Sequence, residues 1–107
     1  MARYLILWRR NPVAPWPRDP DEYSKLLEMS WAGIDGLIRK GEIKEFGWFL
    51  DGISGYAMGE GDGGTVLKNV SMFTTYWDFE VHEIVPHEKG KEIVRALVKA
   101  QIEAMKK

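Results

Sequence analysis

Glu80 and His82 are the residues of this sequence best suited by type and spacing to acid–base chemistry. They stand two positions apart in the segment WDFEVHEIV, where apolar and polar residues alternate, so on a strand both side chains would lie on one face. Histidine titrates near neutral pH, and a neighbouring carboxylate can orient the imidazole as a general base. The pattern predicts His82 as a catalytic acid or base assisted by Glu80. The alternative is a solvated face of an edge strand, which Asp78 and Glu83 favour.

Aromatic side chains supply the candidate binding residues. Trp8, Trp48 and Tyr56 fall in predicted strands, and concave aromatic surfaces with few polar groups are typical of small-molecule pockets. The alternative for these three is ordinary core packing. Trp16 lies between two prolines in a predicted loop, so we expect it either to fold over the mouth of a pocket or to pack against the helix beneath.

A local positive patch is predicted at the end of the first strand. Arg9, Arg10 and Arg18 are followed by the first acidic residue only at Asp19. Guanidinium groups suit the recognition of a carboxylate or phosphate, and we assign Arg9 as an anion clamp. Solvated arginines are the alternative.

The composition argues against other kinds of site. The chain has no cysteine, which excludes disulfides, thiolate zinc sites and cysteine nucleophiles. The only histidine besides His82 is His87, so no metal site is expected, and no cofactor is predicted. A formal charge of -1 does not favour nucleic acid, and the apolar run from Tyr4 to Trp8 is too short for a signal or membrane segment. We therefore expect a cytoplasmic protein with no nucleic-acid or membrane partner.

The elements that must position these residues follow from periodicity and turn chemistry. Strands are predicted over residues 2–9, 43–50, 53–59 and 77–85. Helices are predicted over residues 20–40, from a Thr65 cap to about residue 75, and from Pro86 to the end. Asp19 and Glu22 resemble a capping box, and Asp51-Gly52 predicts a two-residue hairpin turn.

The order β-α-β-β-α-β predicts a ferredoxin-like α+β domain over residues 1–107, with a four-stranded antiparallel sheet plus a C-terminal helix. Two crossover helices would cover one face of this sheet. The first strand is apolar on both sides, so the second face also needs a cover. We expect the sheet of a second copy there, in a homodimer or higher oligomer. The alternative is that the C-terminal helix covers that face within one subunit.

Three segments resemble a known superfamily. The hairpin FGWFLDGISGYAMGEG, the short helix after a Gly-rich acidic turn, and the strand WDFEVHEIVP are similar to the dimeric α/β-barrel superfamily, especially its small uncharacterised members, over about residues 2–86. The long proline-rich first loop departs from that pattern. The resemblance implies a homodimer in which the polar side of the fourth strand lines a cavity against the partner. Relatives include muconolactone isomerase-like proteins, cofactor-free monooxygenases and haem-degrading enzymes, so it implies a pocket without a single reaction.

Two classes of function follow from the sequence. The first is binding of an apolar or aromatic acid in a dimer cavity, extending to cofactor-free isomerase or oxygenase-like catalysis. The second is a non-catalytic module for homo-oligomerisation or protein interaction. An open cavity with His82 facing inward would favour the first class, and a closed barrel filled with aromatic side chains would favour the second.

Overall fold

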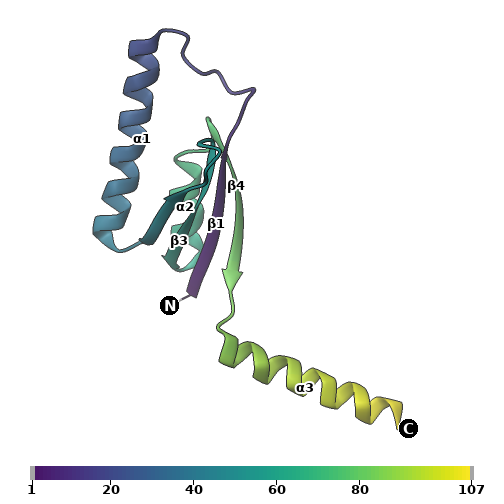
Figure 1. Ribbon diagram of the computed structural model, residues 1–107. Coiled ribbons are helices and arrows are strands. Elements are labelled where there is room, and N and C mark those ends of the chain that lie inside the picture. Colours follow the sequence, from purple (N-terminus) through teal and green to yellow (C-terminus); the bar gives the residue numbers. More distant parts are fainter. Residues whose placement is uncertain (1, 107) are drawn as a thin grey trace.

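A computed structural model describes residues 2–106 of the chain. Its elements follow the order β-α-β-β-α-β-α that the sequence predicts (Figure 1). The strands are β1 (Ala2–Arg10), β2 (Ile43–Trp48), β3 (Ser54–Gly61) and β4 (Trp77–Ile84). The helices are α1 (Pro20–Lys40), α2 (Gly63–Ser71) and α3 (His87–Met105). The predicted α+β class is confirmed, in an arrangement compatible with a ferredoxin-like fold.

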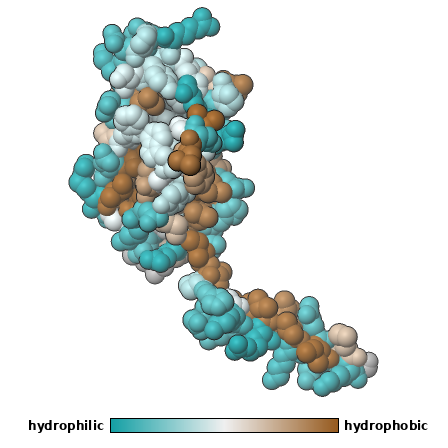
Figure 2. All heavy atoms as spheres, viewed as in Figure 1, coloured by the Kyte–Doolittle hydropathy of each residue, from teal (hydrophilic) through white to brown (hydrophobic). Residues whose placement is uncertain are grey.

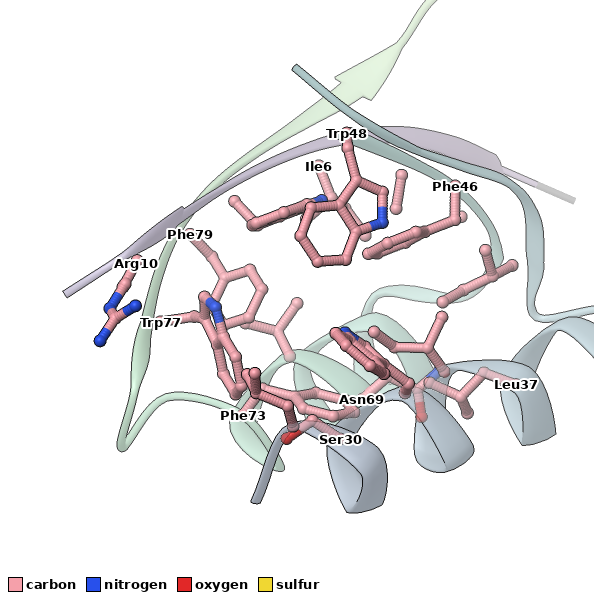
Figure 3. Close-up of a pocket in the computed structure, with 18 of the residues that line it drawn as sticks. Ile6, Arg10, Ser30, Leu37, Phe46, Trp48, Asn69, Phe73, Trp77 and Phe79 are labelled. Carbon is pink, nitrogen blue, oxygen red and sulfur yellow. The ribbon is translucent and has the colours of Figure 1, made fainter. Parts of the chain in front are cut away.

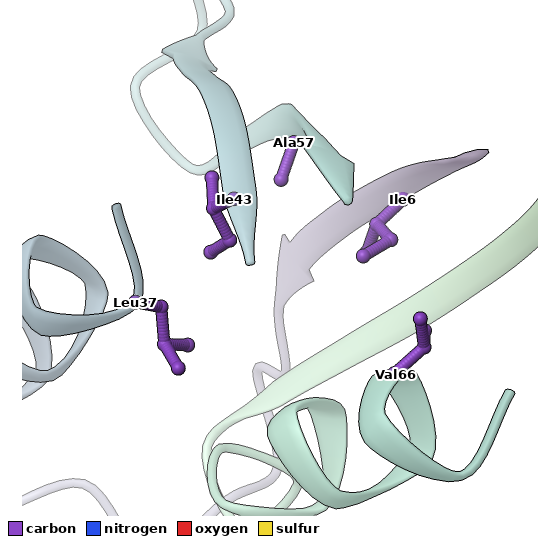
Figure 4. Packing of buried hydrophobic residues seen from close by; sticks show 5 residues of the cluster. All are labelled: Ile6, Leu37, Ile43, Ala57 and Val66. Carbon is purple, nitrogen blue, oxygen red and sulfur yellow. The ribbon is translucent and has the colours of Figure 1, made fainter. Parts of the chain in front are cut away.

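The four strands form one antiparallel sheet in the order β2-β3-β1-β4. β1 is an interior strand and pairs with both β3 and β4. Helices α1 and α2 lie on the same face of the sheet. Figure 4 shows the core that results, in which one side chain from each helix meets three from the sheet. This core consists of Ile6, Leu37, Ile43, Ala57 and Val66.

Helix α1 has the predicted bounds because its ends are set by local chemistry. The Asp19 carboxylate accepts a hydrogen bond from the backbone N–H of Glu22 at 3.3 Å. At the other end Gly41 adopts φ 79°, the left-handed conformation that terminates helices. The orientation of α1 over the sheet is therefore fixed at both ends by the sequence next to it.

A bulge in β2 changes the faces that simple alternation predicts. The pairing with β3 shifts between Ile43 and Glu45, so one additional residue is accommodated there. Ile43 consequently shares the helix-covered face with Phe46 and Trp48. Strict alternation along residues 43–50 would place Ile43 on the face opposite Phe46 and Trp48, and it fails here because the bulge depends on pairing with β3.

The hairpin between β2 and β3 is longer than the predicted two-residue turn. Its loop runs from residue 49 to 53, and Gly52, with φ 75°, donates back to the Phe49 carbonyl at 3.0 Å. Asp51 Oδ1 accepts hydrogen bonds from the backbone N–H groups of Ile53 and Ser54 at 3.0 and 3.1 Å. These hydrogen bonds, with a further one from the Ser54 hydroxyl, hold the pKa of Asp51 below its ordinary value. The aspartate side chain thus organises a wider loop.

Helix α2 begins before the predicted Thr65 cap. The Asp62 carboxylate accepts a hydrogen bond from the Thr65 backbone N–H at 2.8 Å, so Asp62 is the cap and Gly63 the first helical residue. The same hydrogen bond lowers the pKa of Asp62. Thr65 therefore lies in the first turn of α2.

Helix α3 confirms the predicted C-terminal helix but extends away from the rest of the chain (Figure 1). None of its residues from His87 to Met105 is buried. The alternative in which α3 covers the second face of its own sheet is therefore wrong. Within residues 2–106, no helix combines the length and the apolar character needed to cross a membrane.

Replacing Asp51 with alanine should lower thermal stability near neutral pH. The pKa of Asp51 is depressed in the fold, so its carboxylate contributes stability above the pKa of the unfolded chain and loses that contribution as the pH falls. The difference in melting temperature between wild type and Asp51→Ala should be constant above about pH 5 and shrink below about pH 4. Glu92→Ala on the exposed helix α3 is the control. A difference for Asp51→Ala that persists unchanged at low pH would contradict this role.

Candidate ligand-binding site

A cavity of about 210 Å³ lies between the helix-covered face of the sheet and helices α1 and α2. Figure 3 shows Phe46 and Trp48 on its sheet side, with Ser30, Leu37 and Asn69 on its helix side. All five tryptophans of the chain line it. The remaining aromatic lining residues are Tyr23, Phe46, Phe73 and Phe79. The space between the sheet and the two helices thus contains both the hydrophobic core and a pocket. A pocket with a mainly apolar and aromatic lining is typical of small-molecule sites.

Gly55 in β3 makes room for the ring of Trp8. Trp8 pairs with Gly55, and a Cβ at Gly55 would lie 2.4 Å from Trp8 Cζ2 and 2.1 Å from the carbonyl oxygen of Gly47. Neither separation is compatible with a side chain at Gly55. The indole of Trp8 therefore lies directly over the backbone of β3 at Gly55, which has no side chain.

Stacked rings connect the sheet to α1. Trp8 stacks on Phe46 with ring centroids 5.5 Å apart and an interplanar angle of 5°. Trp48 meets the Trp8 ring edge-on at 5.3 Å and contacts Trp31 of α1 at 5.9 Å. Aromatic pairs of this geometry contribute beyond the area they bury, so they fix the orientation of the cavity wall.

Trp16 brings the proline-rich loop against the cavity. Its ring lies 4.9 Å from that of Tyr76, 5.4 Å from that of Trp77 and 6.0 Å from that of Tyr23 in α1. Its indole N–H donates to the Asn11 carbonyl at 2.6 Å, which folds the loop back on itself. Trp16 therefore both packs on the helix and lines the cavity, so the two alternatives from the sequence hold together.

Arg10 provides the positive charge of the cavity. Its guanidinium carbon lies 4.1 Å from the centre of the Trp16 ring and 5.1 Å from that of Tyr23. One of its N–H groups donates to the Tyr23 hydroxyl at 2.5 Å. Figure 3 places Arg10 at the edge of the lining residues, next to Trp77. A guanidinium held between aromatic rings keeps donors available for a planar anion.

The other polar groups that line the cavity differ in whether they have a hydrogen-bond partner. Ser30 donates to the Leu26 carbonyl at 2.9 Å, and Asn69 donates to a Glu42 carboxylate oxygen at 3.2 Å. The indole N–H of Trp8, in contrast, is buried and has no hydrogen-bond partner among residues 2–106. Buried donors without partners are uncommon in proteins.

The predicted site residues divide between the two faces of the sheet. Trp8, Trp16 and Trp48 line the cavity. Arg9 and Tyr56 lie on the opposite face, because each alternates with a cavity-facing neighbour along its strand. The Tyr56 hydroxyl donates to Glu45 at 2.6 Å, which raises the pKa of Tyr56.

His82 and Glu80 also lie on the face opposite the cavity. They are together, as predicted, with His82 Nε2 3.4 Å from a Glu80 carboxylate oxygen. Their side chains are 55% and 65% exposed. In β4 the alternate residues Trp77 and Phe79 face the cavity instead. A ligand in the cavity is therefore out of reach of His82, and a catalytic role for the pair stays a prediction.

Two residues that line the cavity were not assigned to a site from the sequence, although strand alternation and helical periodicity place them there. Arg10 was grouped with Arg9 as basic, but its spacing of two from Trp8 places Arg10 on the cavity face. Trp31 stands four residues after Leu27, so helical periodicity puts both on the face of α1 toward the sheet.

The described chain offers no group of three or more His, Asp or Glu side chains arranged to hold a metal ion. No protein-family model matches this chain, and neither does any curated protein. Function must therefore be inferred from the cavity and from the exposed surfaces.

Gly55→Ala should destabilise the protein by about 2 kcal/mol, because the added methyl group would clash with Trp8 and with the backbone of Gly47. Chemical denaturation followed by circular dichroism would measure the loss. Gly36→Ala in α1 is the matched control, since its Cβ would meet only Arg39, at 3.8 Å, and alanine favours helix by roughly 0.5–1 kcal/mol. Equal stability of Gly55→Ala and wild type would show that Trp8 does not need the close approach.

Proposed function

We propose that the protein binds a small aromatic acid in the cavity between the sheet and helices α1 and α2. The ring of the ligand would lie against the tryptophans, and its anionic group would meet Arg10. The observation that carries the proposal is the gathering of all five tryptophans around one cavity that has Arg10 at its edge.

The volume of the cavity limits the size of the ligand. An engineered apolar cavity of about 150 Å³ binds benzene. A volume of about 210 Å³ therefore suits a substituted ring or a compact two-ring compound. Larger cofactors such as a porphyrin would require the wall to move.

Binding is better supported than catalysis in this cavity. The titratable residues in its lining are Arg10, Tyr23 and Glu42. Tyr23 accepts from Arg10, and Glu42 accepts from Asn69, so neither is poised as a free base. The cofactor-free isomerase or oxygenase-like activity would need His82 and Glu80. These residues lie on the face of the sheet opposite the cavity, the outer face, so that activity would need a second ligand position there.

Homo-oligomerisation is the second candidate function, and the outer face of the sheet favours it. Leu5, Leu7 and Met58 lie at the centre of that face and are only half-buried. Membership of the dimeric α/β-barrel superfamily, with a second copy packed on this face, would account for the apolar character of these three residues. We propose that assembly because of this uncovered apolar surface. It is compatible with ligand binding, because the cavity lies on the other side of the sheet.

An aromatic carboxylate should bind more tightly than its neutral counterpart. We expect 1-naphthoate to bind by isothermal titration calorimetry, and Arg10→Met to weaken it by about 10- to 100-fold, the usual effect of losing a hydrogen bond to a charged group. Binding of neutral 1-naphthalenemethanol should change little in Arg10→Met, which reports that the cavity is intact.

Arg9→Met is the matched control, because Arg9 lies on the opposite face of the sheet. It should leave the affinity for 1-naphthoate unchanged. Loss of naphthoate binding in Arg9→Met but not in Arg10→Met would move the site to the outer face. Absence of binding to wild type for both compounds would refute the cavity as a site for this class of ligand.

Sedimentation velocity at micromolar concentration should report a dimer or larger species, because the outer face and α3 together leave extensive apolar surface uncovered. A clean monomer over this concentration range would contradict both the proposed family and the assembly.

A further inference from the structure

Helix α3 carries an apolar stripe that nothing in its own chain covers. The members of the stripe are each between 45% and 83% exposed, and Figure 2 shows them as a continuous brown band along the helix. They are Ile93, Val94, Leu97, Val98, Ile102 and Met105. Their spacing of three and four places them on one side of the helix. A band of this kind on a projecting helix is a docking surface.

Charge distinguishes the possible partners of this stripe. Residues 87–106 carry five basic and three acidic side chains, whereas residues 2–85 carry nine basic and thirteen acidic ones. Lys91, Arg95 and Lys99, spaced by four, form a basic row along one flank of the stripe, in which Lys91 already pairs with Glu88 at 3.1 Å. Two α3 helices would repel each other, while the acidic remainder of a second copy attracts α3.

The α1–β2 groove is an apolar channel that matches α3. It runs between α1 and the edge strand β2, and its residues Ile38 and Trp48 are 42% and 51% exposed. The residues lining it are Trp31, Ile34, Asp35, Ile38, Phe46 and Trp48. On α1 the lining residues run from Trp31 to Ile38, about 10 Å along the helix axis, so the groove can hold about two turns of the stripe.

One acidic side chain lines the groove, and a second stands beyond its end on the same side of α1. Asp35 lines it, and Glu28 stands seven residues earlier, which is two turns along the same side of α1. The outer face of the sheet carries four carboxylates beside Arg3 and Arg9, so charge does not separate that face from the groove, and the cross-linking partners below do so.

The topology prevents α3 from reaching the groove of its own chain. β2 and β4 are the two opposite edges of the sheet, about 14 Å apart at ordinary strand spacing. Only Val85 and Pro86 connect β4 to α3, and such a connection spans at most about 11 Å. To enter the groove, α3 would first have to cross the sheet. An α3 helix in this groove would therefore belong to another molecule.

We propose that α3 of one copy lies in the α1–β2 groove of a second copy, and that the exchange is reciprocal. The stripe would fill the groove, with the basic row next to Asp35 and Glu28 of the second copy. Reciprocal exchange gives a closed twofold dimer, because each copy supplies one helix and one groove. This contact leaves the outer face of the sheet free for the sheet-to-sheet packing proposed above.

The exchange would also complete the ligand cavity. Trp31, Ile34, Phe46 and Trp48 line both the groove and the cavity, so a helix in the groove closes one side of the cavity. This consequence rests on the proposed function. The docking of α3 does not, since it follows from the exposed stripe, the groove and the topology.

Disulfide cross-linking would test the contact directly, because the chain has no cysteine of its own. Ile38→Cys and Leu97→Cys, prepared separately and mixed under mild oxidation, should yield a covalent dimer containing one copy of each. Ala96→Cys is the matched control for Leu97→Cys, because it lies off the stripe on the same turn of α3. Ala96→Cys should cross-link with Ile38→Cys several-fold less.

A second pairing separates the groove from the outer face. Leu97→Cys mixed with Met58→Cys should give no covalent dimer, since Met58 lies on the outer face. Cross-linking to Met58→Cys in place of Ile38→Cys, or of Leu97→Cys only to itself, would overturn the proposal. No cross-link with any of these partners would overturn it as well.

Sedimentation equilibrium gives an independent measurement. Leu97→Asp should raise the dimer dissociation constant at least about tenfold, whereas Ala96→Asp should leave it unchanged. Neither side chain is buried within its own chain, so the melting of the sheet domain should be the same in both variants. Identical dissociation constants would refute the contact. Neither assay contains a ligand, so failure of naphthoate binding would count against the cavity alone.

Discussion

The structure depends on the near absence of side-chain volume on one face of β3. Gly55, Ala57 and Gly59 face the helices there, and the large side chains of neighbouring strands lie over them. Trp8 from β1 and Trp48 from β2 meet above this strip and bring their rings into edge-on contact. Helices α1 and α2 then pack on an uneven aromatic surface, which leaves a cavity where a flatter sheet would have a closed core.

The small residues of β3 also allow polar and aromatic groups from distant parts of the sequence to meet around the cavity. Rings from β1, β2 and α1 form one wall, and the proline-rich loop supplies Trp16 on the other side of Arg10. The guanidinium of Arg10 lies against the rings of Trp16 and Tyr23 and has no carboxylate partner among the described residues. Its charge is therefore oriented but not neutralised.

The parts of the fold that were predictable are those set by neighbouring residues. Asp19 and Gly41 fix the ends of α1, and alternation in β4 correctly separates Phe79 from His82. The bulge near Ile43 was not predictable, because it exists only through pairing with β3. The Asp51 loop was not predictable for a related reason. The Asp51 carboxylate accepts the backbone hydrogen bonds that carbonyl groups would accept in a tighter turn.

The candidate site was predictable only in part. Periodicity assigns Trp8 and Arg10 to one face and Arg9 to the other, but it does not say which face contains a cavity. That depends on how closely α1 and α2 approach the sheet, which is decided by the sizes of side chains far apart in sequence. The position of α3 lay beyond prediction altogether, because none of its residues from 87 to 105 is buried within the chain.

The isolation of α3 has a consequence for its own secondary structure. A helix of 19 residues without tertiary contacts is only marginally stable in water, and Gly90 in its first turn and the branched side chains along its stripe lower its propensity further. Most of its helical stability must therefore come from whatever covers the stripe. In the proposed exchange, ordering of this segment and association of the protein would be one equilibrium, and the helical content of the chain would depend on its concentration.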